Sequence, residues 1–186
     1  MTVQSLSIPD LKLITPQRFA DSRGFFMELY HRDKFASYGI HDTFVQDNQS
    51  FSSQGTLRGL HYQLPPFEQS KLITVLEGEI YDVVVDVRAH SKTVGQWLGL
   101  KLDSQKRELF YIPSGFAHGF YVLSPTALIQ YKCGNVYNPD YERSLLWNDP
   151  KLGIEWPLLE GVETIVSQKD QNGRCFENLD YIVSDT

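Results

Sequence analysis

Short segments in which apolar and polar residues alternate recur along most of this sequence, and they are separated by Gly, Pro, Asn and Asp. An alternation with a period of two is typical of β-strands, whose successive side chains point to opposite faces. The 3.6-residue periodicity of long helices is nearly absent. The pattern therefore predicts a mainly β chain with few and short helices.

The clearest strand spans residues 80–87, where Tyr81, Val83, Val85 and Val87 fall on one face and two aspartates share the other face with Ile80 and Val84. A tight hairpin is expected at residues 77–79, and a short helix at 32–38 that Asp33 caps and Gly39 ends. Another short helix is expected after Trp156. The other expected strands are residues 71–76, 94–102, 108–112, 118–123 and 127–133.

The length of 186 residues, 41% of them hydrophobic, suits one domain with a sizeable core over residues 1–186. Many short, regularly spaced strands favour a sandwich or barrel that hides its edges, and at this length a jelly roll is the economical choice. The expected fold class is therefore all-β, a jelly-roll barrel with short flanking helices.

The formal net charge of -6, with no dense basic run, argues against a nucleic-acid partner but leaves a small phosphorylated ligand possible. No window approaches the roughly 20 apolar residues of a membrane span, and the N-terminus lacks the features of a secretion signal. Two cysteines, Cys133 and Cys175, are too few for a disulfide framework. We therefore expect neither a membrane partner nor secretion. The expected location is the cytoplasm.

One candidate site surrounds Gly59, with Arg58 before it and His61 two residues after it. Strict alternation would send the Arg58 and His61 side chains to opposite faces, so one shared pocket requires a bulge, which a glycine permits. The alternative is a core histidine beside a surface arginine.

The segment from Pro113 to His118 has the P-x-G-x-x-H spacing found in cupins, which are small jelly-roll barrels. In metal-binding cupins the earlier motif carries an H-x-H pair, but here His61 is followed by Tyr62 and Gln63. The sequence therefore predicts no metal site.

Tyr131 falls on the same strand face as Ala127 and Ile129. This position fits either a structural or a catalytic tyrosine inside a barrel.

Taken together, the chain resembles the dTDP-4-dehydrorhamnose 3,5-epimerase family of deoxysugar biosynthesis. The segments that carry the resemblance are residues 21–28, 44–50, 55–63, 78–80, 86–88, 113–120, 131–132, 147–149 and 169–170, together with Lys71. The least family-like residues are 134–136 and the tail after Asp170.

The resemblance implies a cupin that needs no metal or other cofactor and inverts carbons 3 and 5 of dTDP-4-dehydro-6-deoxy-D-glucose. Both carbons neighbour the C4 ketone, so loss of either proton gives an enolate, and inversion requires a base and an acid on opposite faces. By resemblance, His61 is the base, oriented by Asp170, and Tyr131 is the acid. Lys71 is expected to stabilise the enolate oxygen.

The resemblance also implies a set of substrate-binding residues and an assembly. Arg23, Arg58 and Lys169 are expected to bind phosphates or sugar oxygens, and Tyr137 to stack on thymine. In the family, Arg23 and Glu28 reach the site from the partner subunit, which implies a homodimer with an exchanged N-terminal strand. The helix expected after Trp156 would give the domain a short C-terminal helical tail. The expected polar contacts come from Glu28, Gln46, Asn48, His118 and Glu142.

Three alternatives remain at this point. A 3-epimerase or 5-epimerase that acts on one centre of a related dTDP-4-keto-6-deoxyhexose would share the same motifs. A metal-dependent cupin oxygenase would require bound iron or manganese. A non-catalytic sugar-binding jelly roll would give no reason for His61, Lys71, Tyr131 and Asp170 to occur together.

Overall fold

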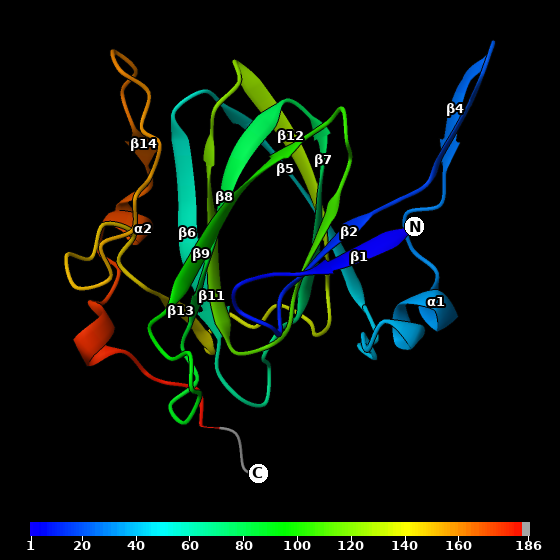
Figure 1. Ribbon diagram of the computed structural model, residues 1–186. Coiled ribbons are helices and arrows are strands. Elements are labelled where there is room, and N and C mark those ends of the chain that lie inside the picture. The colour runs from blue at the N-terminus through cyan, green and yellow to red at the C-terminus, as the bar shows by residue number, and fades with distance from the viewer. Residues whose placement is uncertain (184–186) are drawn as a thin grey trace.

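The computed structural model describes residues 1–183 and is built mainly from strands (Figure 1). The helices are short: α1 (Arg32–Ser37), α2 (Gln168–Gln171) and a 3-10 turn, η1 (Phe176–Asn178). The strands are β1 (Thr2–Ser5), β2 (Lys12–Thr15), β3 (Arg18–Asp21), β4 (Gly24–Met27), β5 (Gln46–Ser53), β6 (Thr56–Gln63), β7 (Lys71–Glu77), β8 (Glu79–Asp86), β9 (Trp97–Asp103), β10 (Leu109–Ile112), β11 (Phe116–Val122), β12 (Thr126–Cys133), β13 (Glu142–Ser144) and β14 (Ile165–Val166).

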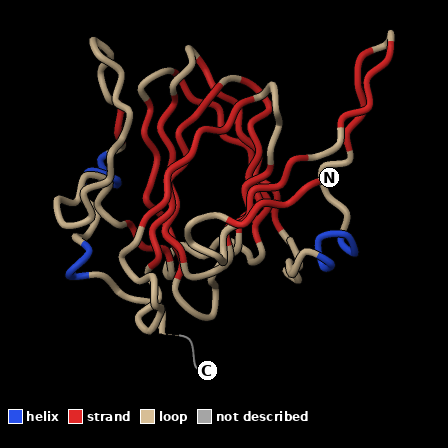
Figure 2. The backbone as a smooth tube through the Cα atoms, viewed as in Figure 1, coloured by secondary structure: helices blue, strands red, loops and turns tan. Residues whose placement is uncertain are grey.

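Two six-stranded sheets face each other and form a barrel. The first sheet has the order β1-β2-β10-β7-β12-β5, and the second has the order β13-β6-β11-β8-β9 with β14 added beside β6. Figure 2 shows that the helices lie only at the periphery of these sheets. The predicted all-β jelly-roll barrel with short flanking helices is confirmed.

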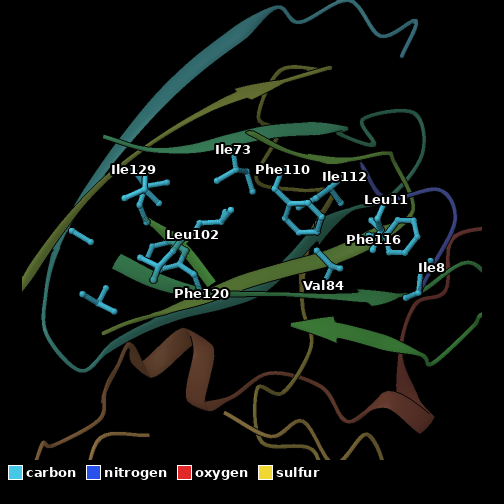
Figure 3. Close-up of a cluster of buried hydrophobic side chains, with 14 residues drawn as sticks. Ile8, Leu11, Ile73, Val84, Leu102, Phe110, Ile112, Phe116, Phe120 and Ile129 are labelled. Carbon is cyan, nitrogen blue, oxygen red and sulfur yellow. The ribbon is translucent and has the colours of Figure 1, made fainter. Parts of the chain in front are cut away.

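The main core lies between the two sheets (Figure 3). Ile73 and Phe110 of the first sheet meet Leu102 and Phe120 of the second, and all four are buried. This burial of large apolar side chains is the main stabilising contribution that the fold can make.

Strand β8 separates two clusters, as its alternation predicted. Ile80 and Val84 belong to the core between the sheets, whereas Val83 and Val85 pack on the outer side of the second sheet. The C-terminal segment covers that outer side, with Leu179 among the buried residues there.

Helix α1 covers the outer side of the first sheet through Phe35, which packs in a cluster with Leu72 and Leu109. The predicted helix is confirmed, and Gly39 follows its end with a positive φ of 79°. The predicted cap is wrong, because Asp33 lies inside the helix and its carboxylate accepts from Arg32 Nε at 2.9 Å, while His31 is the N-cap residue.

The predicted hairpin at residues 77–79 is also wrong. Strand β7 belongs to the first sheet and β8 to the second, so Gly78 turns the chain from one sheet to the other. Its φ is +82°, and a Cβ at this position would lie 2.1 Å from the carbonyl oxygen of Thr126. Gly78 therefore correctly predicted a turn at this place, but the sequence did not predict which strands pair.

Several strand limits differ from the predicted ones. The strand expected from Val94 begins only at Trp97, because Gln96 N–H donates to Thr93 C=O at 2.9 Å in a turn and Val94 is exposed. The strands expected at 108–112 and 118–123 lie at Leu109–Ile112 and Phe116–Val122. The predicted C-terminal helix corresponds to α2 and η1.

The antiparallel pair β3–β4 projects away from the barrel in Figure 1. Its aromatic residues Phe19, Phe25 and Phe26 are exposed, Phe26 to 68%. Over residues 1–183, no helix is both long and apolar enough to cross a membrane.

Candidate active site

A pocket of about 700 Å³ opens between the two sheets. This volume is in the range of small-molecule sites in proteins. The predicted site residues that line it are Gln46, Asn48, Arg58, His61, Lys71, His118, Tyr131, Tyr137, Glu142, Lys169 and Asp170.

His61 and Arg58 both face the pocket because β6 contains the predicted bulge. His118 pairs with His61 and Phe120 with Arg58, so β6 has one more residue than β11 between these two pairs. Gly59 makes this possible: its φ is +117°, and a Cβ there would lie 2.5 Å from Gly119 Cα. The alternative expected a core histidine and a surface arginine. Arg58 is exposed as it expected, but the His61 side chain is 29% exposed and faces the pocket, so His61 is not a core residue.

Asp170 reaches His61 through a parallel strand pairing far along the chain. Strand β14 pairs with β6 at Thr56 and Leu57, and α2 follows it directly. Ser167 caps α2 by accepting from Asp170 N–H at 3.1 Å. Asp170 is thereby fixed beside the strand that carries His61.

The Asp170 carboxylate makes two hydrogen bonds with β6. Its Oδ1 lies 2.6 Å from His61 Nε2, and its Oδ2 accepts from Gly59 N–H at 3.2 Å. Burial opposes ionisation, but these hydrogen bonds outweigh it and hold the pKa of Asp170 below its ordinary value. A carboxylate in this position fixes the orientation and tautomer of the imidazole.

Lys71 begins β7 on the first sheet and is almost completely buried, with 8% of its surface exposed. Its Nζ donates to the backbone oxygen of His61 at 3.3 Å. Burial lowers the pKa of Lys71, because desolvation penalises the ammonium. An ammonium has three donors, so Lys71 has further donors for a ligand in the pocket.

Tyr131 lies on β12 of the first sheet, whereas His61 lies on β6 of the second. Since both line the pocket, they stand on opposite walls. Burial raises the pKa of Tyr131 and keeps its hydroxyl protonated as a donor. A ligand between these walls would have an imidazole on one face and a phenol on the other.

Asp82 is a residue that the sequence analysis did not assign to the site. Its Oδ2 lies 2.9 Å from His118 Nε2, and its side chain is fully buried. Burial raises the pKa of Asp82 and lowers the pKa of His118. The available signal was its strand parity with Ile80 and Val84, which places a carboxylate inside the barrel.

The outer part of the pocket carries a group of linked polar residues. Glu142 accepts from the Tyr137 hydroxyl at 2.8 Å and also binds the Lys169 ammonium. These two hydrogen bonds outweigh the effect of burial and lower the pKa of Glu142. Gln46 Nε2 donates to Asn48 Oδ1 at 3.1 Å.

Arg23 and Glu28 are the two predicted site residues that do not line this pocket. Arg23 lies in the β3–β4 turn and binds Asp21 at 2.6 Å, while Glu28 follows β4 and binds Lys34 at 2.5 Å. Their distance from the pocket of their own chain is the feature that an exchanged strand would explain.

Within residues 1–183, no three His, Cys, Asp or Glu side chains converge as a metal site would require. The two pocket histidines are each bonded to a carboxylate, and Gln63 stands where an H-x-H pair would have its second histidine. The absence of a metal requirement stays a prediction, and chelation tests it.

A jelly-roll barrel with an imidazole, a phenol and an ammonium around one pocket has the groups of an enzyme that transfers protons to and from a small-molecule ligand. The sequence profile of the dTDP-4-dehydrorhamnose 3,5-epimerase family matches residues 5–178. The chain belongs to this family.

Named relatives agree with this assignment. The dTDP-4-dehydrorhamnose 3,5-epimerase of Shigella flexneri is 45% identical over 184 residues, which are 98% of this chain and 100% of the relative. A 3,5-epimerase structure from Legionella pneumophila in complex with dTDP-4-keto-L-rhamnose has a TM-score of 0.94 at 43% identity, covering 100% of this chain and 99% of that one.

A 3'-monoepimerase from Streptomyces bikiniensis, solved with dTDP-quinovose, has a TM-score of 0.86 at 34% identity. The match covers 93% of this chain and 87% of the Streptomyces chain. The fold is thus shared by enzymes named for one and for two inverted centres, but this chain is more similar to the 3,5-epimerases above.

Proposed function

We propose that this protein inverts carbons 3 and 5 of dTDP-4-dehydro-6-deoxy-D-glucose and releases dTDP-4-dehydro-L-rhamnose. The observation that carries the proposal is the pairing of His61 with Asp170 on one pocket wall and Tyr131 on the other. Family membership and the dTDP-sugar in the Legionella relative support the choice of substrate.

In the proposed reaction His61 removes the proton from carbon 3 or carbon 5, and the electron pair of the broken C–H bond moves into the C4 carbonyl. Asp170 stabilises the imidazolium that forms. Lys71 donates a hydrogen bond to the enolate oxygen as it gains negative charge. Tyr131 then gives its proton to the opposite face of the same carbon, which completes the inversion. His61 releases its proton to solvent and Tyr131 takes one from solvent, so both groups are restored before the second carbon reacts.

The polar residues at the outer part of the pocket bind the nucleotide in this proposal. Arg58 and Lys169 offer positive charge to the diphosphate, and Tyr137 offers an exposed ring to the thymine. Gln46, Asn48, His118 and Glu142 supply polar contacts. No cofactor is needed, because side chains perform every proton transfer.

We further propose a homodimer in which the β3–β4 pair enters the site of the second copy. The pair projects from its own barrel and exposes three phenylalanines, an arrangement that a partner surface would cover. It would bring Arg23 and Glu28 to the partner's pocket. A cytoplasmic location fits the two free cysteines.

Product analysis tests the function directly. Incubation of the purified protein with dTDP-4-dehydro-6-deoxy-D-glucose in deuterium oxide, followed by NMR, shows which carbons change configuration. Inversion at both centres is the expected result. Inversion at one centre would instead identify a 3-epimerase or 5-epimerase, and no inversion would leave only binding.

A further inference from the structure

Gln63 is the last residue of β6 and lines the pocket two residues after His61. It is 4% exposed, so its polar atoms require partners within the protein. Its Nε2 donates to the backbone oxygens of Phe67 at 2.5 Å and Val136 at 3.2 Å. Its Oε1 accepts from Asn138 N–H at 2.7 Å.

Two of these hydrogen bonds hold the backbone on either side of Tyr137. They bind the carbonyl of Val136 before it and the amide of Asn138 after it. Gln46 Oε1 accepts from the Tyr137 N–H itself at 2.9 Å. The ring of Tyr137 contributes little packing, since the residue is 51% exposed. Side-chain amides from β5 and β6 therefore fix the backbone on both sides of this tyrosine.

We propose that Gln63 is a positioning residue that prepares Tyr137 to stack on the nucleotide base. The inference rests on the proposed function, which gives Tyr137 its stacking role. A loop held in its bound conformation loses less entropy when the ligand arrives, so the nucleotide binds more tightly. An amide suits the task because it donates two hydrogen bonds and accepts as well.

The contacts of Gln63 also determine which step it affects. Both donors of Nε2 point to backbone oxygens, so this nitrogen has no further hydrogen for the reacting sugar. Loss of Gln63 should therefore weaken base binding and leave proton transfer at saturation largely unchanged.

The first test compares dTDP with inorganic pyrophosphate by titration calorimetry. Gln63→Leu removes all three hydrogen bonds, and Gln63→Glu keeps an acceptor for Asn138 but removes the donors. We expect about a tenfold or greater loss of dTDP affinity in Gln63→Leu, since each lost hydrogen bond weakens the held loop. Pyrophosphate affinity should change less than about twofold, as it lacks a base.

Gln54→Leu is the matched control. Gln54 also donates one side-chain amide bond to a backbone oxygen, that of Leu123 at 2.8 Å, but it does not line the pocket. Its dTDP affinity should equal that of the wild type. In steady-state assays Gln63→Leu should raise KM with kcat within about threefold, the pattern of lost uniform binding.

A double-mutant cycle separates this inference from the proposed function. Once Tyr137→Ala has removed the ring, adding Gln63→Leu should cost little further dTDP affinity. Fully additive losses would overturn the positioning role. If Tyr137→Ala alone binds dTDP as the wild type does, the stacking role in the proposed function fails instead.

Hydrogen exchange tests the inference on the wild-type protein, whether or not the variants fold. The Asn138 amide is expected to exchange slowly in the free protein, because buried Gln63 accepts its hydrogen. Exchange of that amide at the rate of an open loop would overturn the proposal.

Discussion

His61 and Asp170 are separated by 109 positions in the sequence, yet their Nε2 and Oδ1 atoms lie 2.6 Å apart. The parallel pairing of β14 with β6 produces this contact. Because Asp170 also binds the N–H of Gly59, the carboxylate is held by the same bulge that turns His61 into the pocket. The base and its partner are therefore fixed by one local structure.

Asp170→Asn should lower kcat on the order of 100-fold or more, because the amide cannot stabilise the imidazolium and can hold the wrong tautomer. Glu177→Gln serves as a control, as it removes a surface carboxylate that binds Lys151 outside the pocket. Turnover is measured by product NMR at saturating substrate. A kcat equal to that of the wild type would remove Asp170 from the mechanism.

Exchange with solvent distinguishes the base from the acid. In deuterium oxide the wild type should incorporate deuterium at carbons 3 and 5, and His61→Ala should abolish both exchanges because no enolate forms. Tyr131→Phe keeps the ring but removes the hydroxyl, so His61 can still exchange a proton on the original face. We expect deuterium incorporation with much reduced inversion, and unimpaired inversion would make Tyr131 a structural residue.

The charge of Lys71 should help catalysis and cost stability. Because burial lowers its pKa in the folded state, the unfolded chain binds the proton more tightly. The resulting destabilisation is full at pH below the folded pKa and disappears as the pH rises to the ordinary lysine value. Lys71→Met should therefore raise Tm at neutral pH, a gain that fades toward about pH 10.4.

The same variant should lower kcat by about 100-fold, since the enolate oxygen loses its cationic donor. Thermal unfolding across pH and steady-state assays give the two readouts. Lys101→Met is the control, because Lys101 binds Glu79 on the surface and should change neither. A Lys71→Met protein that is less stable at neutral pH would show that the ammonium stabilises the fold.

The parts of the fold that sequence could predict were those in which alternation and burial agree. Strand β8 has both faces buried, and its alternate side chains lie in the two clusters that the pattern predicted. The pattern did not predict strands β3 and β4, because their apolar residues, such as Phe25 and Phe26, stand next to each other and do not alternate with polar ones. The turn at Gly78 was visible, but strand pairing depends on contacts distant in sequence.

The candidate site shows the same limit. The bulge at Gly59 could be predicted, because two polar side chains flank a glycine within a strand. The pairing of His61 with Asp170 came from family resemblance, since residue spacing does not determine which distant segments meet. Asp82 and Gln63 were missed because each acts through a neighbour, His118 or the backbone around Tyr137.

Activity should survive exhaustive dialysis against EDTA. The proposed proton transfers use side chains alone, and the pocket histidines are already bonded to Asp82 and Asp170. Elemental analysis before and after dialysis checks that metal was removed. Lost turnover that iron or manganese restores would contradict this prediction and favour a metal-dependent cupin.

Strand exchange predicts that two inactive variants can restore each other. Arg23→Ala with Glu28→Gln damages the segment given to the partner, whereas His61→Ala damages the barrel that receives it. In a mixed dimer the barrel with intact His61 receives an intact segment, so one site of the two works. Random subunit exchange makes half of the dimers mixed and should recover about one quarter of wild-type activity. Mixtures are measured after partial denaturation and refolding, with light scattering to determine mass. If each chain used its own Arg23 and Glu28, no mixed dimer would contain a complete site, and activity would not exceed the sum of the two variants measured separately.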